Sequence, residues 1–244
     1  RPAGVVGDWF FTLDPDGVDP VLKVHSLGEC YRKGNPHYDQ RSTVPAIVDV
    51  TTGAVVNNDY HDLTTELETA WKKYFRPDAP DLYPEALRDD IDALNDIIYA
   101  DVNLAVNLAA LVTSQKDYEF YYNKVFDRLD WLEKRLSSRR YLFGDTITDP
   151  DIRLYVTLAR FDLVFYQKYY VNKKRLVDYP NLWNYAKDLY SHPAFGKNTD
   201  FDSMRKRFYY VDHTPFEDFP RIVPKGPDMS IWEEPNDRAA KFAK

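Results

Sequence analysis

Apolar residues recur at two different spacings along this chain, and the spacing changes near residue 82. Upstream of that point, glycine and proline punctuate the sequence, and a helical pattern covers 21–34. The β-branched stretch 43–50 and the short run 54–56 flank a glycine-containing turn, which predicts a hairpin. A further helix is predicted over 59–74. The amino-terminal part is therefore expected to be a small α/β unit.

Downstream of a proline-containing loop, the pattern is helical almost to the end. Ser114 and Thr148 each precede an acidic residue by three positions, which is typical of a capped helix start, and Pro180 suits a first helical turn. The tail after Thr214 is rich in proline and is predicted to be irregular. The expected fold is mainly α with a small α/β part. The predicted helices cover 84–112, start near Ser114, Thr148 and Pro180, and cover 201–210.

Composition narrows the class of protein. The chain has 244 residues, of which 44% are hydrophobic, and a formal net charge of −7. No apolar run approaches the roughly 20 residues that a membrane span needs, so no membrane partner is expected. An acidic chain without a clustered basic face does not favour nucleic acid as a partner.

Cys30 is the only cysteine, so the chain cannot form an internal disulfide, which is compatible with a reducing cytoplasm. It falls on the apolar side of a predicted helix, where a cysteine is typically a small buried hydrophobe. A reactive thiol would need a helix amino terminus or a neighbouring cation. The five histidines show no paired ligand spacing, so no metal site is expected.

Several segments, in this order, resemble the glutathione transferases, and specifically the xi-class, omega-like branch of glutathionyl-hydroquinone reductases. In the amino-terminal part they are Thr43-Val44-Pro45-Ala46, the hairpin, and Val56-Asn57-Asn58-Asp59. In the helical part they are Leu82-Tyr83-Pro84, Arg140-Tyr141-Leu142, 148–154, Arg160-Phe161-Asp162, 178–183 and Ile222-Val223-Pro224.

This resemblance implies a thioredoxin-like, thiol-binding domain over 1–82 that lacks its first strand and helix, followed by an all-helical domain over 83–244. It also implies a homodimer. In the family, a Cys-Pro motif after the first strand provides the thiolate that attacks the glutathionyl group of a conjugated quinol. The sequence contains no Cys-Pro pair. We therefore expect the catalytic cysteine to lie upstream of Arg1.

The resemblance assigns thiol-binding roles to Trp9, Val44, Pro45, Asp59 and Tyr60. It implies a cis bond before Pro45, with the backbone of Val44 binding the cysteinyl part of the thiol; a trans proline opening a strand is the alternative. Asp59-Tyr60 stands where the family has Glu-Ser, so Asp59 either binds the γ-glutamyl amine or only caps a helix. Trp9 either covers the thiol or anchors a loop.

The resemblance places the aromatic-substrate pocket at Asn107, Phe165, Tyr209 and Tyr210. The family has tyrosines at the first two of these positions. Tyrosine hydroxyls in such a pocket donate hydrogen bonds to a quinol oxygen and stabilise developing negative charge. Asn107 can still donate, whereas Phe165 cannot.

Two hypotheses about function follow. The first is a thiol-dependent reductase of glutathionyl-hydroquinone-type aromatic conjugates. Its co-substrate would be glutathione or another low-molecular-weight thiol, with mycothiol and γ-glutamylcysteine left open because of Asp59-Tyr60. The second is a catalytically silent transferase fold kept as a binding or scaffold protein.

Overall fold

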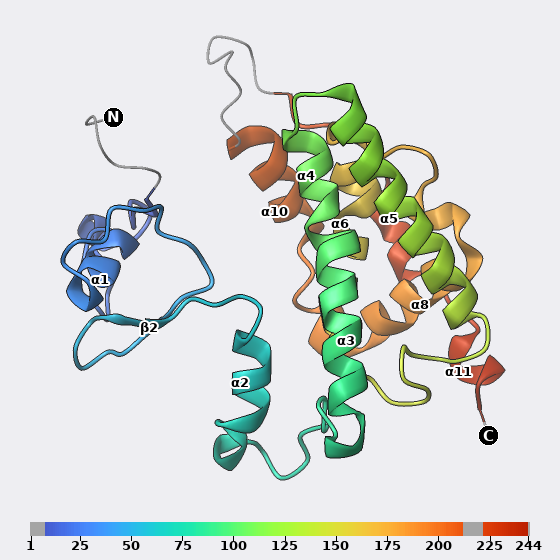
Figure 1. Ribbon diagram of the computed structural model, residues 1–244, viewed down its shortest axis with the longest axis horizontal. Coiled ribbons are helices and arrows are strands. Elements are labelled where there is room, and N and C mark those ends of the chain that lie inside the picture. The colour runs from blue at the N-terminus through green and yellow to red at the C-terminus, as the bar shows by residue number, and fades with distance from the viewer. Residues whose placement is uncertain (1–7, 212–221, 244) are drawn as a thin grey trace. The chain divides into compact units, whose positions relative to one another are not determined.

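The computed structural model describes residues 8–211 and 222–243. The chain divides into two compact units, Arg1–Pro80 and Asp81–Lys244. Each unit has a hydrophobic core of its own. The prediction of a small α/β part and a larger helical part is confirmed (Figure 1).

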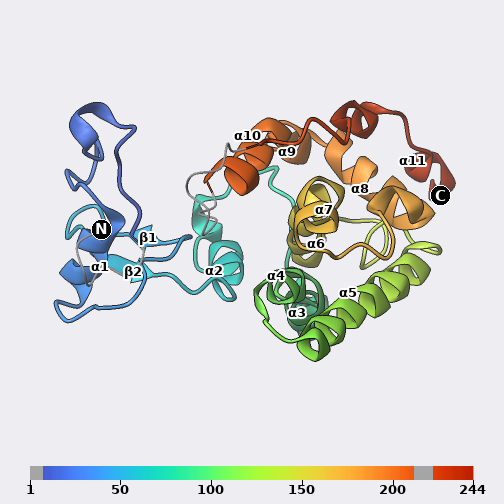
Figure 2. The same cartoon turned by 90° about the horizontal axis from the view of Figure 1, so that it is seen from above.

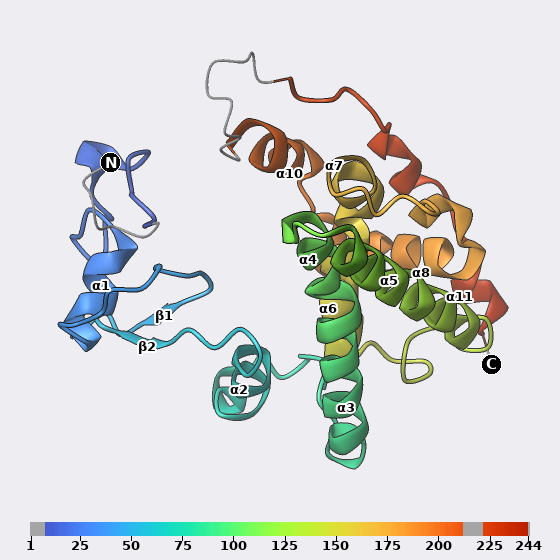
Figure 3. The same ribbon diagram turned by 45° about the horizontal axis from the view of Figure 1, so that its top comes forward.

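The amino-terminal unit is built on a short hairpin and one helix. Strand β1 (Ile47–Val48) pairs antiparallel with β2 (Val55–Asn57), and α1 (Leu27–Gly34) packs against β2 (Figure 3). The turn between the strands needs glycine at Gly53. Its φ is +68°, and a β-carbon there would lie 2.6 Å from Nζ of Lys33. The predicted hairpin is confirmed.

Helix α1 begins at Leu27, so the prediction of a helix from residue 21 is wrong for its first turns. The Asp19 carboxylate accepts hydrogen bonds from the backbone N–H groups of Val21 and Leu22, at 2.9 and 2.6 Å, and holds a turn there. The helix starts after Ser26, where the Glu29 carboxylate accepts the Ser26 N–H at 3.0 Å. Apolar periodicity carries no information about such side-chain hydrogen bonds, so it placed the start of this helix too early.

The second predicted helix of this unit is also shorter than expected. Helix α2 covers Leu63–Thr69, and a separate 3₁₀ turn covers Lys72–Tyr74. Residues 59–62 form a turn ahead of α2, because the Asp59 carboxylate accepts the backbone N–H groups of His61 and Asp62.

The named secondary-structure elements of the carboxy-terminal unit are all helical among its described residues, and loops connect them (Figure 1). Its longer helices agree with the predicted starts at Ser114, Thr148 and Pro180. Its helices are α3 (Arg88–Ile98), α4 (Ala105–Leu111), α5 (Gln115–Leu136), α6 (Asp149–Arg160), α7 (Tyr166–Lys168), α8 (Pro180–Ser191), α9 (Pro193–Gly196), α10 (Phe201–Lys206) and α11 (Arg238–Lys241).

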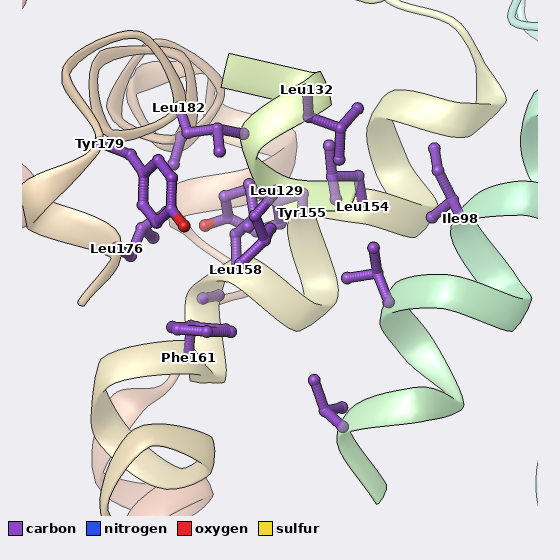
Figure 4. Close-up of a cluster of buried hydrophobic side chains, with 14 of the residues drawn as sticks. Ile98, Leu129, Leu132, Leu154, Tyr155, Leu158, Phe161, Leu176, Tyr179 and Leu182 are labelled. Atoms are coloured by element: carbon purple, nitrogen blue, oxygen red, sulfur yellow. The ribbon is translucent and has the colours of Figure 1, made fainter. Parts of the chain in front are cut away.

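Helix α6 occupies the middle of this unit, with α3 and α8 packed against it (Figure 2). Leu154 and Leu158 of α6 are fully buried, and Figure 4 shows them beside Leu129 and Leu132 of α5. Leu182 of α8 belongs to the same core. Burying such a side chain stabilises the fold by roughly 1.5–3 kcal/mol relative to leaving it exposed.

Three π-helical turns interrupt the helices of this unit, and apolar periodicity did not predict them. They cover Tyr99–Asn103, Phe161–Phe165 and Arg207–Val211. The predicted helix over 84–112 is therefore a 3₁₀ turn, α3, a π turn and α4 in succession. Single π turns inside α-helices are frequent at functional sites.

The tail was predicted to be irregular, and this is wrong for part of it. A 3₁₀ helix covers Met229–Glu233 and α11 follows. The Arg238 guanidinium explains the order of this end, because its Nη2 donates to the carbonyl oxygens of Leu136 and Arg140 at 3.2 and 2.6 Å.

Candidate functional site

Two side-chain hydrogen bonds fix the segment that precedes Val44 and Pro45 in the amino-terminal unit. Asn58 Nδ2 donates to Thr43 Oγ1 at 3.3 Å, which joins the segment before Pro45 to the turn that begins at Asp59. Tyr31 Oη donates to the Thr43 carbonyl at 2.8 Å and fixes the same segment to α1. Neither Asn58 nor Tyr31 was among the predicted site residues.

The backbone of Val44 is open to a ligand. The Val44–Pro45 peptide bond is cis, as the resemblance implies, and Val44 is 54% exposed. Within residues 8–80, no described hydrogen bond uses the N–H or C=O of Val44. An extended ligand can therefore pair with both groups without displacing an internal bond.

Asp59 acts as a turn cap in this structure. One carboxylate oxygen, Oδ1, accepts from the N–H of His61 at 2.8 Å and of Asp62 at 3.3 Å. Oδ2 has no hydrogen bond among the described contacts of residues 8–80, so the cap leaves one oxygen for a ligand amine. Tyr60 beside it is 43% exposed.

Trp9 is 38% exposed and is held through its backbone, since its carbonyl accepts the Leu27 N–H at 2.9 Å. Asp8 fixes this segment: its Oδ1 accepts the Gly28 N–H at 2.8 Å. Burial alone would raise the pKa of Asp8, but hydrogen bonds from Ser26, Gly28, Trp9 and Ser42 together hold it below its ordinary value. Because Ser42 precedes Val44 by two residues, Asp8 also links Trp9 to the Pro45 segment.

Cys30 is completely buried in the core formed with Val24, Leu27 and Tyr31, as its position in the pattern predicted. Burial is the largest influence on this thiol and raises its pKa. A thiol of this kind is protonated at neutral pH and out of reach of a substrate, so Cys30 is not suited to nucleophilic attack.

In the carboxy-terminal unit, Phe165 and Tyr209 lie on neighbouring turns. The rings of Phe165 and Phe208 are 6.1 Å apart, and Tyr209 Oη donates to the Leu163 carbonyl at 3.3 Å. Lys168 Nζ donates to the Phe208 carbonyl and lies 5.6 Å from the centre of the Tyr209 ring. Burial raises the pKa of Tyr209, against a smaller lowering by Arg205, so the phenol is a hydrogen-bond donor at neutral pH.

Asn107 is engaged within its own helix. Its Nδ2 donates to the Asn103 carbonyl at 2.7 Å, and in residues 81–211 no described contact joins it to Phe165 or Tyr209. Tyr210, the fourth predicted pocket residue, has a side chain outside the described part of the chain. Phe165, Tyr209 and Tyr210 lie in π turns, and Asn107 lies in α4 four residues after one; apolar periodicity did not predict these π turns.

Residues 8–211 and 222–243 contain no group of three histidine, cysteine, aspartate or glutamate side chains placed to hold a metal ion. No helix within them has the length and apolar character needed to cross a membrane.

Comparison with known proteins gives consistent matches. The family model of the glutathione S-transferase C-terminal domain matches residues 115–188. The glutathionyl-hydroquinone reductase YqjG of Escherichia coli is 35% identical over 99% of this chain and 73% of its own length. The omega-like glutathione S-transferase 2 of Schizosaccharomyces pombe is 34% identical over 94% of this chain and 77% of its own length.

Solved structures agree with these matches. The crystal structure of a glutathione transferase from Gordonia bronchialis is similar with a TM-score of 0.89 and 43% identity, covering 97% of this chain and 73% of the other. The glutathione-bound structure of Escherichia coli YqjG has a TM-score of 0.85 and 34% identity, covering 96% of this chain and 75% of the other.

Proposed function

This chain belongs to the glutathione transferase superfamily, in the branch that contains the glutathionyl-hydroquinone reductases, and we propose that it is part of a thiol-dependent reductase of glutathionyl-hydroquinone-type aromatic conjugates. The observation that carries the proposal is the 35% identity to such a reductase over almost the whole chain. Its glutathione-bound structure supports glutathione as the co-substrate.

The proposed reaction has two steps. A cysteine thiolate attacks the sulfur of the conjugate, the carbon–sulfur bond breaks, and the ring carbon takes up a proton, which leaves a mixed disulfide on the enzyme and a free quinol. A second thiol then attacks the mixed disulfide, releases glutathione disulfide and restores the enzyme thiolate. In sum, one conjugate and one thiol become one quinol and one disulfide.

The proposal takes the nucleophile from a Cys-Pro motif upstream of Arg1. Cys30 is fully buried, its pKa is raised by burial, and the sequence has no other cysteine. Buried cysteines of this kind are chemically inert.

In the proposed arrangement, residues 1–82 bind the thiol. Its cysteinyl part pairs with the N–H and C=O of Val44 beside Pro45, and the remaining oxygen of Asp59 accepts from its amine. Trp9 and Tyr60 flank it as exposed aromatic side chains. The support for these roles is the set of links through Asp8, Thr43 and Asn58 that joins the three segments.

Residues 83–244 provide the aromatic-substrate pocket in this proposal. Tyr209 is its hydrogen-bond donor, Phe165 packs an apolar wall, and Asn107 and Tyr210 complete it. The support is the partly buried, protonated phenol of Tyr209, which is hydrogen-bonded to Leu163, and the neighbouring ring pair of Phe165 and Phe208. We also propose that the protein is a homodimer, on the basis of the family. We propose a cytoplasmic location, with which the single buried thiol is compatible.

The direct test is turnover of S-(2,5-dihydroxyphenyl)glutathione by the product of the complete reading frame, with excess glutathione. The proposal predicts equal amounts of hydroquinone and glutathione disulfide, measured by chromatography. It also predicts that Cys30→Ser keeps the wild-type rate.

Two outcomes would contradict it. A folded protein that binds glutathione without releasing hydroquinone would favour the non-catalytic binding protein. Loss of turnover in folded Cys30→Ser would place the nucleophile inside the chain.

A further inference from the structure

A pocket of about 490 Å³ lies in the carboxy-terminal unit, in the usual size range for small-molecule sites. Neither Phe165 nor Tyr209 lines it, so it is separate from the proposed quinol pocket. Three stretches enclose it: the π turn with α7, the loop before α8, and the tail around Met229–Glu233. Figures 2 and 3 show this tail on the same side of the bundle as α7.

The base of the pocket is aromatic and well packed. Trp232 is 4% exposed, and its ring meets those of Trp183 and Tyr190 at centroid distances of 4.9 and 5.6 Å. Met229 lines the pocket next to it, and Tyr166 lines it from α7. A flat ring fits such walls, since aromatic and thioether side chains make favourable contacts with aromatic groups.

One carboxylate, that of Asp162, stands in this apolar surface. Its Oδ1 accepts the Leu176 N–H at 2.6 Å and its Oδ2 accepts the Val177 N–H at 3.3 Å. Each carboxylate oxygen can accept a second hydrogen bond. Burial raises the pKa of Asp162 in spite of these two bonds, so the ionised group is incompletely stabilised.

The one cation among the described lining residues, Arg175, forms its ion pair with Asp178. Arg175 donates to both oxygens of Asp178, with Nε–Oδ2 at 3.1 Å and Nη2–Oδ1 at 2.8 Å. The charge of Arg175 lowers the pKa of Asp162 in part, but no cation among the described lining residues hydrogen-bonds the Asp162 carboxylate, which therefore complements a positively charged ligand group.

We propose that this pocket binds a small aromatic amine in its protonated form, with the ring against Trp232 and Met229 and the ammonium group on Asp162. The ring supplies apolar contact, and the ammonium supplies the charge-assisted hydrogen bonds that Asp162 lacks. Tyr166, which also lines the pocket, offers an aromatic ring to the same ligand.

Titration calorimetry with two matched probes tests the proposal on the full chain, without thiol or quinol present. Tryptamine and indole-3-propionate share an indole ring and carry an ammonium and a carboxylate group, respectively. Tryptamine is expected to bind at least about tenfold more tightly. Equal affinity for the two probes, or no saturable tryptamine binding up to about 1 mM, would overturn the proposal.

Two variants locate the binding. Asp162→Asn is expected to weaken tryptamine about tenfold without weakening indole-3-propionate. Because Asp162 also holds the Leu176 turn, Val177→Trp serves as an independent variant that fills the pocket and should abolish binding. Asn172→Ala, exposed in the same loop, should leave affinity unchanged. Unchanged tryptamine affinity in folded Asp162→Asn or Val177→Trp would overturn the proposal.

Discussion

At the scale of single residues, the sulfur of Cys30 lies in the core of the amino-terminal unit, where burial raises its pKa. Its reactivity should therefore depend on unfolding rather than on pH near neutrality. We expect a thiol-specific reagent to label Cys30 at least about 100-fold more slowly in the native protein than in guanidinium chloride.

A matched control is Ser114→Cys in a Cys30→Ser background, which puts the one thiol of the chain at an exposed helix cap. That protein should label at similar rates in both conditions. Rapid native labelling of Cys30 would contradict its assignment to the core.

Asp8 gives a pH-dependent prediction. Its folded pKa lies below 3.8, so its contribution to stability is present above that pH and is lost as the pH falls through the folded pKa. Asp8→Asn should lower the free energy of unfolding by about 1 kcal/mol at pH 7. Urea unfolding at several pH values should show this difference shrinking below pH 3.8. A difference that stays constant to pH 2.5 or so would count against the carboxylate's role.

Tyr209 gives a prediction for activity. In the proposed pocket the Tyr209 hydroxyl exchanges its 3.3 Å hydrogen bond to the Leu163 carbonyl for one to the quinol oxygen, so Tyr209→Phe should lower kcat by about 100-fold. Tyr170→Phe is the matched control, because Tyr170 is 64% exposed, and it should keep the wild-type rate. Steady-state kinetics of hydroquinone release by the complete protein measure both. Wild-type kcat in folded Tyr209→Phe would remove this residue from the proposed pocket.

At this scale the sequence indicates which residues are buried or polar, but it does not indicate their hydrogen-bond partners. Cys30 could be placed in the core because apolar spacing reports burial. Asp8 could not be connected to Gly28, because a side-chain bond across 20 residues leaves no periodic signal. The same holds for the bond between Asn58 and Thr43.

At the scale of elements, polar capping residues predicted where helices start, whereas apolar runs overestimated how far they extend. The predicted start at Thr148 is confirmed, since the Asp151 carboxylate accepts both the N–H and the hydroxyl of Thr148, at 2.8 and 3.0 Å. The run over 21–34 overestimated α1, because Val24 is buried without being helical. Nothing in apolar spacing separates an α turn from a π turn, so the three π turns were missed.

The docking of α11 yields a stability prediction. Arg238 is 1% exposed and binds carbonyl oxygens at the end of α5, so removing its guanidinium leaves buried acceptors unpaired. Arg238→Met should lower the free energy of unfolding by about 3 kcal/mol in urea. Lys241→Ala on the exposed side of α11 should change it by less than about 0.5 kcal/mol. Equal effects of the two substitutions would show that Arg238 does not anchor the tail.

At the scale of the whole molecule, the chain carries two units with different predicted roles. The larger unit contains the stretch that matches the transferase C-terminal family model, and the smaller contains the open Val44 backbone. Fold class followed from periodicity, and the family followed from ordered motifs such as Val44-Pro45 and Arg160-Phe161-Asp162. Pocket volumes and buried charges did not follow from either, because they depend on packing between distant segments.

In the proposed reaction, a thiolate other than that of Cys30 carries the glutathionyl group during turnover. The most direct measurement is peptide mapping by mass spectrometry of the complete protein, quenched with acid during reaction with S-(2,5-dihydroxyphenyl)glutathione and a limiting amount of glutathione. We predict one glutathionyl adduct, on a peptide containing a Cys-Pro motif, and an unmodified Cys30 peptide. An adduct on Cys30, or release of hydroquinone with no adduct on any cysteine, would contradict it.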